Sequence, residues 1–172
     1  YTITVTVASY PGFIKNGTSG SNAPCKNLTI KNINVAVSGS GSLAKYGGWI
    51  GQSNFGARIN GGIIVFENCS STGSIGTDSG GISGGTTGIY MINSTITFSN
   101  CYSTGTIGKD GPENDAGGIS GYESGFSMNN STITFNNCYS TGAIGQYAGG
   151  ISGERTGRYM SNSTITFNNC YS

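Results

Sequence analysis

Five cysteines carry the most reactive side chains of this 172-residue chain, which contains no histidine. Without histidine, Ser-His-Asp and Cys-His catalytic arrangements are excluded, and the commonest metal ligand is missing. Four cysteines recur at intervals of 32, 37 and 32 residues, at Cys69, Cys101, Cys138 and Cys170. A fainter upstream copy of the motif aligns Ala36 with Cys69, so we expect a small, buried, apolar position that reduced cysteine fills well. Cys25 lies outside this series and could be a free or cross-linking thiol.

Carboxylates are the next groups to consider, because paired acids would allow a repetitive β protein to cleave polysaccharides. Four of the seven acidic residues are scattered over different positions of the repeat: Glu67, Asp78, Glu123 and Glu154. Asp110, Glu113 and Asp115 cluster in one segment, where they could hold Ca²⁺ or simply form a solvated turn. We therefore predict no catalytic residue, no cofactor and no metal site apart from this candidate calcium loop.

Asparagine offers a third chemistry, because Asn-x-Ser/Thr is the acceptor motif for N-glycosylation of exported proteins. Three of these motifs fall at the same position of successive repeats, each as Asn-Ser-Thr, at Asn93, Asn130 and Asn162. Further motifs start at Asn16, Asn27, Asn68 and Asn129. The alternative is that these are unmodified asparagines at turns, which arise by chance in a chain rich in Asn, Ser and Thr.

A tyrosine follows each of the last three cysteines of the series, at Tyr102, Tyr139 and Tyr171. Successive side chains of a strand alternate between its faces, so an inward cysteine places these rings outside. An exposed stripe of this kind could stack on sugars or pack against another filament. The alternative is that the rings only stack on one another and stabilise the sheet.

The elements that must position these groups follow from the repeat itself, Cys-(Ser/Tyr)-Ser-Thr-Gly-x-Ile-Gly. Its one longer interval is explained by five extra residues within 109–116. Three short segments per repeat have strand composition and are separated by glycine and asparagine corners; in the second copy they are 94–98, 101–107 and 117–121. We predict an all-β fold, a parallel β-solenoid (β-helix) of about four 32-residue rungs. A β-sandwich or prism is the alternative.

Stacked rungs would bury continuous columns of like residues, because Ile96 and Phe98 are two apart and share the inner face. We expect the asparagines that precede the cysteines, at 68, 100, 137 and 169, to form a hydrogen-bonded ladder along the stack.

The chain divides at about residue 28, because residues 1–28 do not follow the repeat. We expect this N-terminal segment either to cap the solenoid or to join it to another subunit by strand addition. The repeats then occupy residues 29–172, approximately as 29–62, 63–94, 95–131, 132–163 and a partial copy at 164–172. We expect this last copy to be continued by a longer array or covered by a neighbouring subunit.

Composition limits the partners of the chain. With 9% charged residues and a formal net charge of +1, it has no basic run that would bind nucleic acid. No apolar stretch approaches the roughly 18 to 20 residues that span a bilayer.

The unit Ala-Gly-Gly-Ile-Ser-Gly, followed after a variable stretch by Phe-Asn-Asn-Cys-Tyr-Ser-Thr-Gly-Ala-Ile-Gly, resembles the GLUG-type repeats of large extracellular surface proteins and adhesins. The likeness covers residues 47–172 and is strongest over 63–172. It implies an extracellular or cell-surface location and a structural or adhesive role, and it carries no catalytic residue.

We therefore predict a non-enzymatic structural repeat protein, either the subunit of a self-assembling filament or a segment of a stalk or adhesin. Its expected partners are other copies of itself, head to tail or laterally, and attached or bound glycans. One alternative is a carbohydrate-binding module that uses the tyrosine stripe, and a less favoured one is a polysaccharide-degrading β-helix enzyme.

Overall fold

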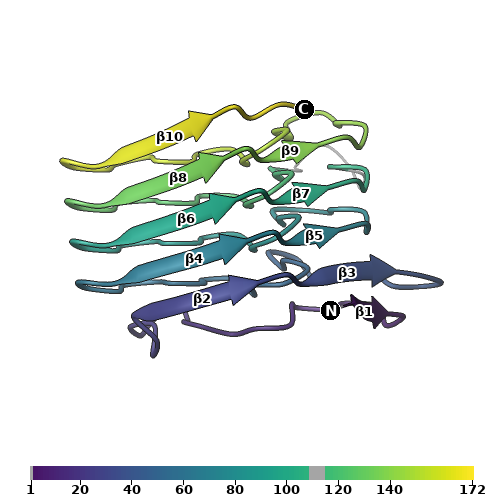
Figure 1. Cartoon of the computed structure of the whole chain (residues 1–172), viewed down its shortest axis with the longest axis horizontal. Coiled ribbons are helices and arrows are strands. Elements are labelled where there is room, and N and C mark those ends of the chain that lie inside the picture. The colour runs from purple at the N-terminus through teal and green to yellow at the C-terminus, as the bar shows by residue number, and fades with distance from the viewer. Residues whose placement is uncertain (1, 109–114) are drawn as a thin grey trace.

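The computed structural model describes residues 2–108 and 115–172, and the chain winds into a parallel β-solenoid of about five turns (Figure 1). The described residues contain ten strands: β1 (Thr2–Val5), β2 (Asn27–Lys31), β3 (Asn34–Val37), β4 (Ile63–Glu67), β5 (Ser70–Ser71), β6 (Thr95–Ser99), β7 (Tyr102–Ser103), β8 (Thr132–Asn136), β9 (Tyr139–Ser140) and β10 (Thr164–Asn168). No helix in these two ranges is long and apolar enough to cross a membrane.

The strands form two parallel sheets, in the orders β1-β3-β5-β7-β9 and β10-β8-β6-β4-β2. Neighbours within a sheet are one turn apart in the chain, so β6 pairs with β8 and Ile96 lies beside Ile133. Figure 1 shows the turns stacked from the N-terminal to the C-terminal end, with one strand of each sheet in most turns. The prediction of a parallel β-solenoid is confirmed.

The core consists of columns that run along the stack, as the alternation of apolar residues predicts. Ile96 and Phe98 are fully buried, whereas Thr97 between them is only partly buried. The ring of Phe98 stacks on Phe66 with centroids 4.9 Å apart and on Phe135 with centroids 5.0 Å apart. This distance is close to the spacing of paired strands, so backbone pairing sets the packing of the core. Each turn buries its apolar face only through its neighbours.

The predicted asparagine ladder is present. The Nδ2 of Asn100 donates to the Oδ1 of Asn68 at 3.2 Å, and the Nδ2 of Asn137 donates to the Oδ1 of Asn100 at 3.2 Å. Asn100 has a φ of 52°, in the left-handed region that asparagine tolerates better than most residues. Asparagine therefore suits this corner twice, through its backbone conformation and through its amide.

The segment predicted as the third strand of each turn is bent instead of extended. The N–H groups of Ile82 and Ser83 both donate to the carbonyl of Ile119, at 2.9 and 3.0 Å. In an extended strand consecutive N–H groups point in opposite directions. This segment therefore pairs with the next turn only through isolated bridges, such as Ser83 with Ser120.

In the first turn, the predicted alignment of Ala36 with Cys69 is wrong. Asn34 pairs with Ser70, which places Ile33 beside Cys69. The cause is a longer connection in this turn, because strand partners are 36 residues apart here and the glycine-corner partners that follow are 32 apart. An alignment that matches the glycine corners therefore shifts β3 out of register with its true partner, β5. The position accepts isoleucine, so its shared requirement is an apolar side chain and not a small one.

The N-terminal residues follow the path of the solenoid. β1 pairs in parallel with β3, and farther along Tyr10 bridges Leu43 and Ile14 bridges Gly51. These contacts bring the count to about five turns, where the repeats alone predict about four. The role of residues 1–28 as a cap or a joining segment stays a prediction.

Candidate functional site

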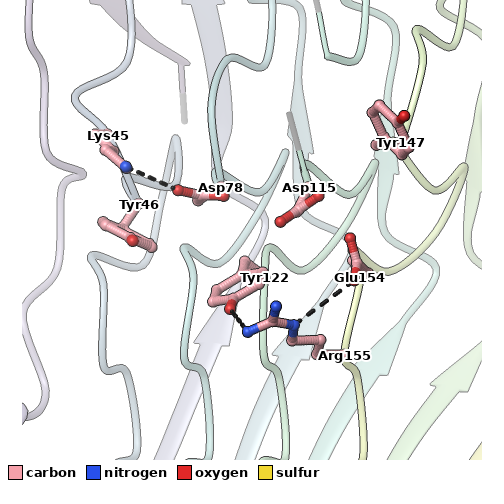
Figure 2. Close-up of a pocket in the computed structure, with 8 residues that line it drawn as sticks. All are labelled: Lys45, Tyr46, Asp78, Asp115, Tyr122, Tyr147, Glu154 and Arg155. Carbon is pink, nitrogen blue, oxygen red and sulfur yellow. Dashed lines mark hydrogen bonds and ion pairs between the residues drawn. The ribbon is translucent and has the colours of Figure 1, made fainter. Parts of the chain in front are cut away.

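Charged and aromatic side chains gather in a groove on one side of the solenoid (Figure 2). The groove has a volume of about 420 Å³ and is lined by Lys45, Tyr46, Asp78, Asp115, Tyr122, Tyr147, Glu154 and Arg155. We refer to these eight residues as the polar groove. They belong to the corners of four successive turns, close to the glycine corners.

The first column of the polar groove consists of residues at one position of the repeat. Gly48, Gly80, Gly117 and Gly149 bridge one another from turn to turn. The residues two positions before these glycines are Tyr46, Asp78, Asp115 and Tyr147. Two carboxylates therefore lie between two tyrosines along the axis, as Figure 2 shows. At about 4.8 Å per turn the column spans about 14 Å.

The second column contributes Tyr122 and Glu154, which are equivalent because the backbone N–H of Glu123 donates to the carbonyl of Glu154 one turn on. One turn earlier this column has Gly85, and a Cβ added there would lie 2.9 Å from the Cδ1 of Tyr46. The glycine makes room for the ring of Tyr46, whose centroid is 6.2 Å from that of Tyr122.

Both cations of the polar groove are held by partners. The Nζ of Lys45 lies 3.4 Å from the carboxylate of Asp78, whose side chain is only 8% exposed. Arg155 donates from Nη1 to the hydroxyl of Tyr122 at 2.5 Å, and its Nε lies 3.6 Å from the carboxylate of Glu154. These pairs fix the side chains along the walls of the groove, as the dashed lines in Figure 2 indicate.

Asp115 is the group of the polar groove whose acidity is most clearly altered. Burial, a hydrogen bond with Glu154 and the nearby charges of Glu154 and Asp78 raise its pKa to about 6, against a lowering by Arg155. Asp115 therefore keeps its proton to a higher pH than an ordinary aspartate does. Because the folded-state pKa exceeds the ordinary value of 3.8, Asp115 favours folding below about pH 4, and this contribution is lost as the pH rises through about 6.

Replacement of Glu154 by glutamine should lower the pKa of Asp115 toward its ordinary value, because the like charge of Glu154 is removed and only burial and the charge of Asp78 still raise it. An NMR titration of the Asp115 side-chain carboxyl carbon measures this shift. Glu67→Gln is the control, since Glu67 lies in β4 and pairs with Lys31 at 2.7 Å. An Asp115 pKa that stays near 6 in Glu154→Gln would show that Glu154 does not contact this carboxyl.

Although the acidic residues are scattered over the repeat in the sequence, Asp78, Asp115 and Glu154 line the same groove. Asp115 lies at the end of the inserted segment, and removal of the five extra residues aligns it with Asp78. This alignment is the feature of the sequence from which their proximity can be predicted. Asp110 and Glu113 of the candidate calcium loop lie outside the described residues. Among the residues that are described, no three His, Cys, Asp or Glu side chains are placed to hold one metal ion.

The cysteine column lies in the core and its thiols are reduced. Cys101 is fully buried, and its Sγ donates to the carbonyls of Phe66 and Ser99 at 3.5 and 3.4 Å. Hydrogen bonds with the thiols of Cys138 and Cys69, together with burial, raise the pKa of Cys101. The reactive thiolate is therefore disfavoured there.

Iodoacetamide should label Cys25 first, because its thiol is exposed. The three buried thiols Cys69, Cys101 and Cys138 should react at least about a hundredfold more slowly, since labelling requires local opening of the stack. Cys170, which is partly buried, should react at an intermediate rate. Mass spectrometry of peptides after timed labelling gives the five rates. Equal rates for Cys25 and Cys101 in the folded protein would contradict a packed thiol column.

The tyrosine stripe is a stack of rings. Tyr102 and Tyr139 have centroids 4.9 Å apart and Tyr139 and Tyr171 have centroids 5.0 Å apart, each pair within 2° of parallel. Sugars bind to the faces of aromatic rings, and both faces of Tyr139 are covered by its neighbours. Tyr171 is exposed at the end of the stack, so its outer face is open to a ligand.

The aligned sequons lie at exposed corners. Asn93, Asn130 and Asn162 are exposed and have φ values of 47°, 45° and 48°. Asn27 and Asn129 are also exposed.

Two other sequon asparagines have structural partners. Asn16 is buried, and its side-chain amide exchanges two hydrogen bonds of 3.0 Å with the backbone of Cys25. The amide of Asn68 belongs to the asparagine ladder, where it donates to Asn32 at 3.2 Å. The three aligned sites are therefore the most accessible acceptors with a shared position.

Comparisons of the chain with protein-family models, with curated protein sequences and with solved structures give no match.

Proposed function

We propose that the chain is a non-enzymatic structural protein of the cell surface or extracellular space, a segment of a filament, stalk or adhesin that extends by end-to-end stacking of solenoid turns. The observation that carries this proposal is that, at several positions of the repeat, the side chains of successive turns stack on one another along the solenoid axis. Phenylalanine, asparagine, cysteine and tyrosine each form their own ladder along the same axis. Backbone hydrogen bonds of two parallel sheets run along that axis as well.

The C-terminal turn is suited to continue the stack. β10 lies at the edge of its sheet, and Phe167 is 48% exposed whereas its column neighbour Phe135 is fully buried. β10 presents the same residue types that β8 presents to it, from Thr132 paired with Thr164 to Asn136 paired with Asn168. The first turn of a second copy, with β2 at the other edge of this sheet, could add in parallel.

Two further observations support a location outside the cell. The repeats resemble the GLUG-type repeats of extracellular surface proteins. The aligned sequons at Asn93, Asn130 and Asn162 are exposed, which suits glycosylation of an exported protein.

The assembly proposal is tested by sedimentation velocity over a range of concentrations, with electron microscopy of the sedimenting species. The wild-type chain should form filaments that grow with concentration. Phe167→Lys should remain monomeric, because a charge in the phenylalanine column would be buried at the junction. The control is Ile63→Lys, which places the same charge on an exposed side-wall position of β4. A monomeric wild type, or a Phe167→Lys chain that assembles normally, would rule out end-to-end stacking.

A further inference from the structure

We propose that the polar groove binds a neutral oligosaccharide that lies along the solenoid axis. This inference concerns a side wall of the solenoid and does not depend on the assembly of its ends. The groove residues are Lys45, Tyr46, Asp78, Asp115, Tyr122, Tyr147, Glu154 and Arg155.

The residues of the polar groove differ from the columns of the core and from the asparagine ladder, in which one residue type recurs from turn to turn. Other outward-facing columns also vary, such as Asn60, Ile92, Asn129 and Ser161, but they do not place carboxylates on neighbouring turns. The first column of the groove reads Tyr46, Asp78, Asp115 and Tyr147, and stacking does not call for that order. Two adjacent aspartates on neighbouring turns repel each other, and the side chain of Asp78 is more than nine-tenths buried. Stability of the stack therefore does not explain the two adjacent carboxylates, and this points to a ligand.

The side chains of the polar groove match the chemistry of a sugar. A saccharide has apolar C–H faces, which pack on aromatic rings, and rows of hydroxyl groups, which donate strong hydrogen bonds to carboxylates. Tyr46 and Tyr147 lie at the two ends of the column, with Asp78 and Asp115 between them (Figure 2). Tyr147 is 56% exposed and leaves much of its side chain available for contact. The span of about 14 Å suits a chain of several sugars better than a single one.

The charges of the polar groove favour a neutral chain over an anionic one. Three carboxylates face two cations, and each cation already has a carboxylate partner: Lys45 with Asp78, and Arg155 with Glu154. Glu123 lies beside the groove and also contacts Arg155, at 3.7 Å. Among the eight described residues of the polar groove, no uncompensated positive charge is therefore left for a uronic acid, a sulfate or a phosphate. Lys45 and Arg155 still supply N–H donors to sugar hydroxyls at fixed positions.

The experiment is a glycan array of neutral, amino-sugar and uronic-acid oligosaccharides, followed by titration calorimetry with the best neutral one. Tyr147→Ala and Asp115→Asn should each weaken binding by at least about tenfold, because a hydrogen bond to a charged group or a stacked ring is lost. Tyr159→Ala is the control, since this exposed tyrosine lies outside the groove, and it should leave the affinity unchanged. Circular dichroism checks that each variant is folded.

Four results would overturn the proposal. No neutral oligosaccharide binds, or uronic acids bind best, or Tyr147→Ala and Asp115→Asn bind as well as the wild type. The fourth is that binding is lost in Tyr139→Ser and kept in both groove variants, which would place the sugar on the tyrosine stripe. Calorimetry with calcium chloride alone is run in parallel. Heat that depends on Asp115, with no sugar binding, would identify a cation site in place of a saccharide site.

Discussion

Phe98→Ala is expected to lower the free energy of unfolding by about 3 to 5 kcal/mol. Phe98 is fully buried, and its ring stacks between those of Phe66 and Phe135 at 4.9 and 5.0 Å. The backbone pairing of β6 with β4 and β8 fixes the distance between turns, so the neighbours cannot close the cavity. Urea denaturation followed by circular dichroism measures the change.

Phe167→Ala is the matched control for this prediction. Phe167 belongs to the same column but has a phenylalanine on only one side, at 4.9 Å from Phe135, and is partly exposed. Its replacement should cost less than half as much as that of Phe98, measured at a concentration where the chain is monomeric. Equal losses for the two variants would show that the column does not carry the stability of the inner turns.

Gly80→Ala is expected to destabilise the protein by at least about 3 kcal/mol or to prevent folding, since overpacking against fixed backbone lies at the upper end of such costs. A Cβ at this position would lie 1.9 Å from the carbonyl oxygen of Ser83 and 2.6 Å from the backbone nitrogen of Gly121 in the next turn. Both atoms belong to the backbone and cannot move aside without disrupting the corner. The glycine is therefore required by close approach.

Gly20→Ala tests the same substitution where space is open. A Cβ at Gly20 would have no atom within 4 Å, so stability should change by less than about 1 kcal/mol. Thermal unfolding of the two variants side by side provides the comparison. If Gly80→Ala melted within a few degrees of the wild type, the result would contradict the close backbone approach at this corner.

The solenoid can be predicted well from the sequence because the period of the repeat determines which residues contact each other. A residue type that recurs once per turn must contact its own copy in the next turn, so the repeat alone places Phe98, Cys101 and Asn100 in columns. The alternation of Ile96, Thr97 and Phe98 then fixed which side faces the core.

The first turn and the bent corner could not be predicted in the same way. Ala36 was misplaced because the first turn has a longer connection, and a gap of that kind is invisible where the repeat is faint. The segment at 117–121 has strand composition, yet its glycines allow a backbone bend that composition does not encode.

The polar groove was missed for a different reason. Its eight residues come from four positions of the repeat and from four turns. At two of these positions the groove contains different side chains in successive turns. A search for recurring residues discards such positions as variable. Only the register of the turns, which places Asp115 beside Asp78 in spite of the insertion, brings these carboxylates together.

We propose that the stack of parallel turns continues from one copy of the chain to the next, and electron cryomicroscopy of the assembled chain tests this proposal. Filaments should have a turn spacing of about 4.8 Å that passes unbroken through each junction, where β10 of one copy pairs with the first turn of another. Isolated particles at all concentrations, or filaments in which copies meet side by side with β10 left uncovered, would contradict it.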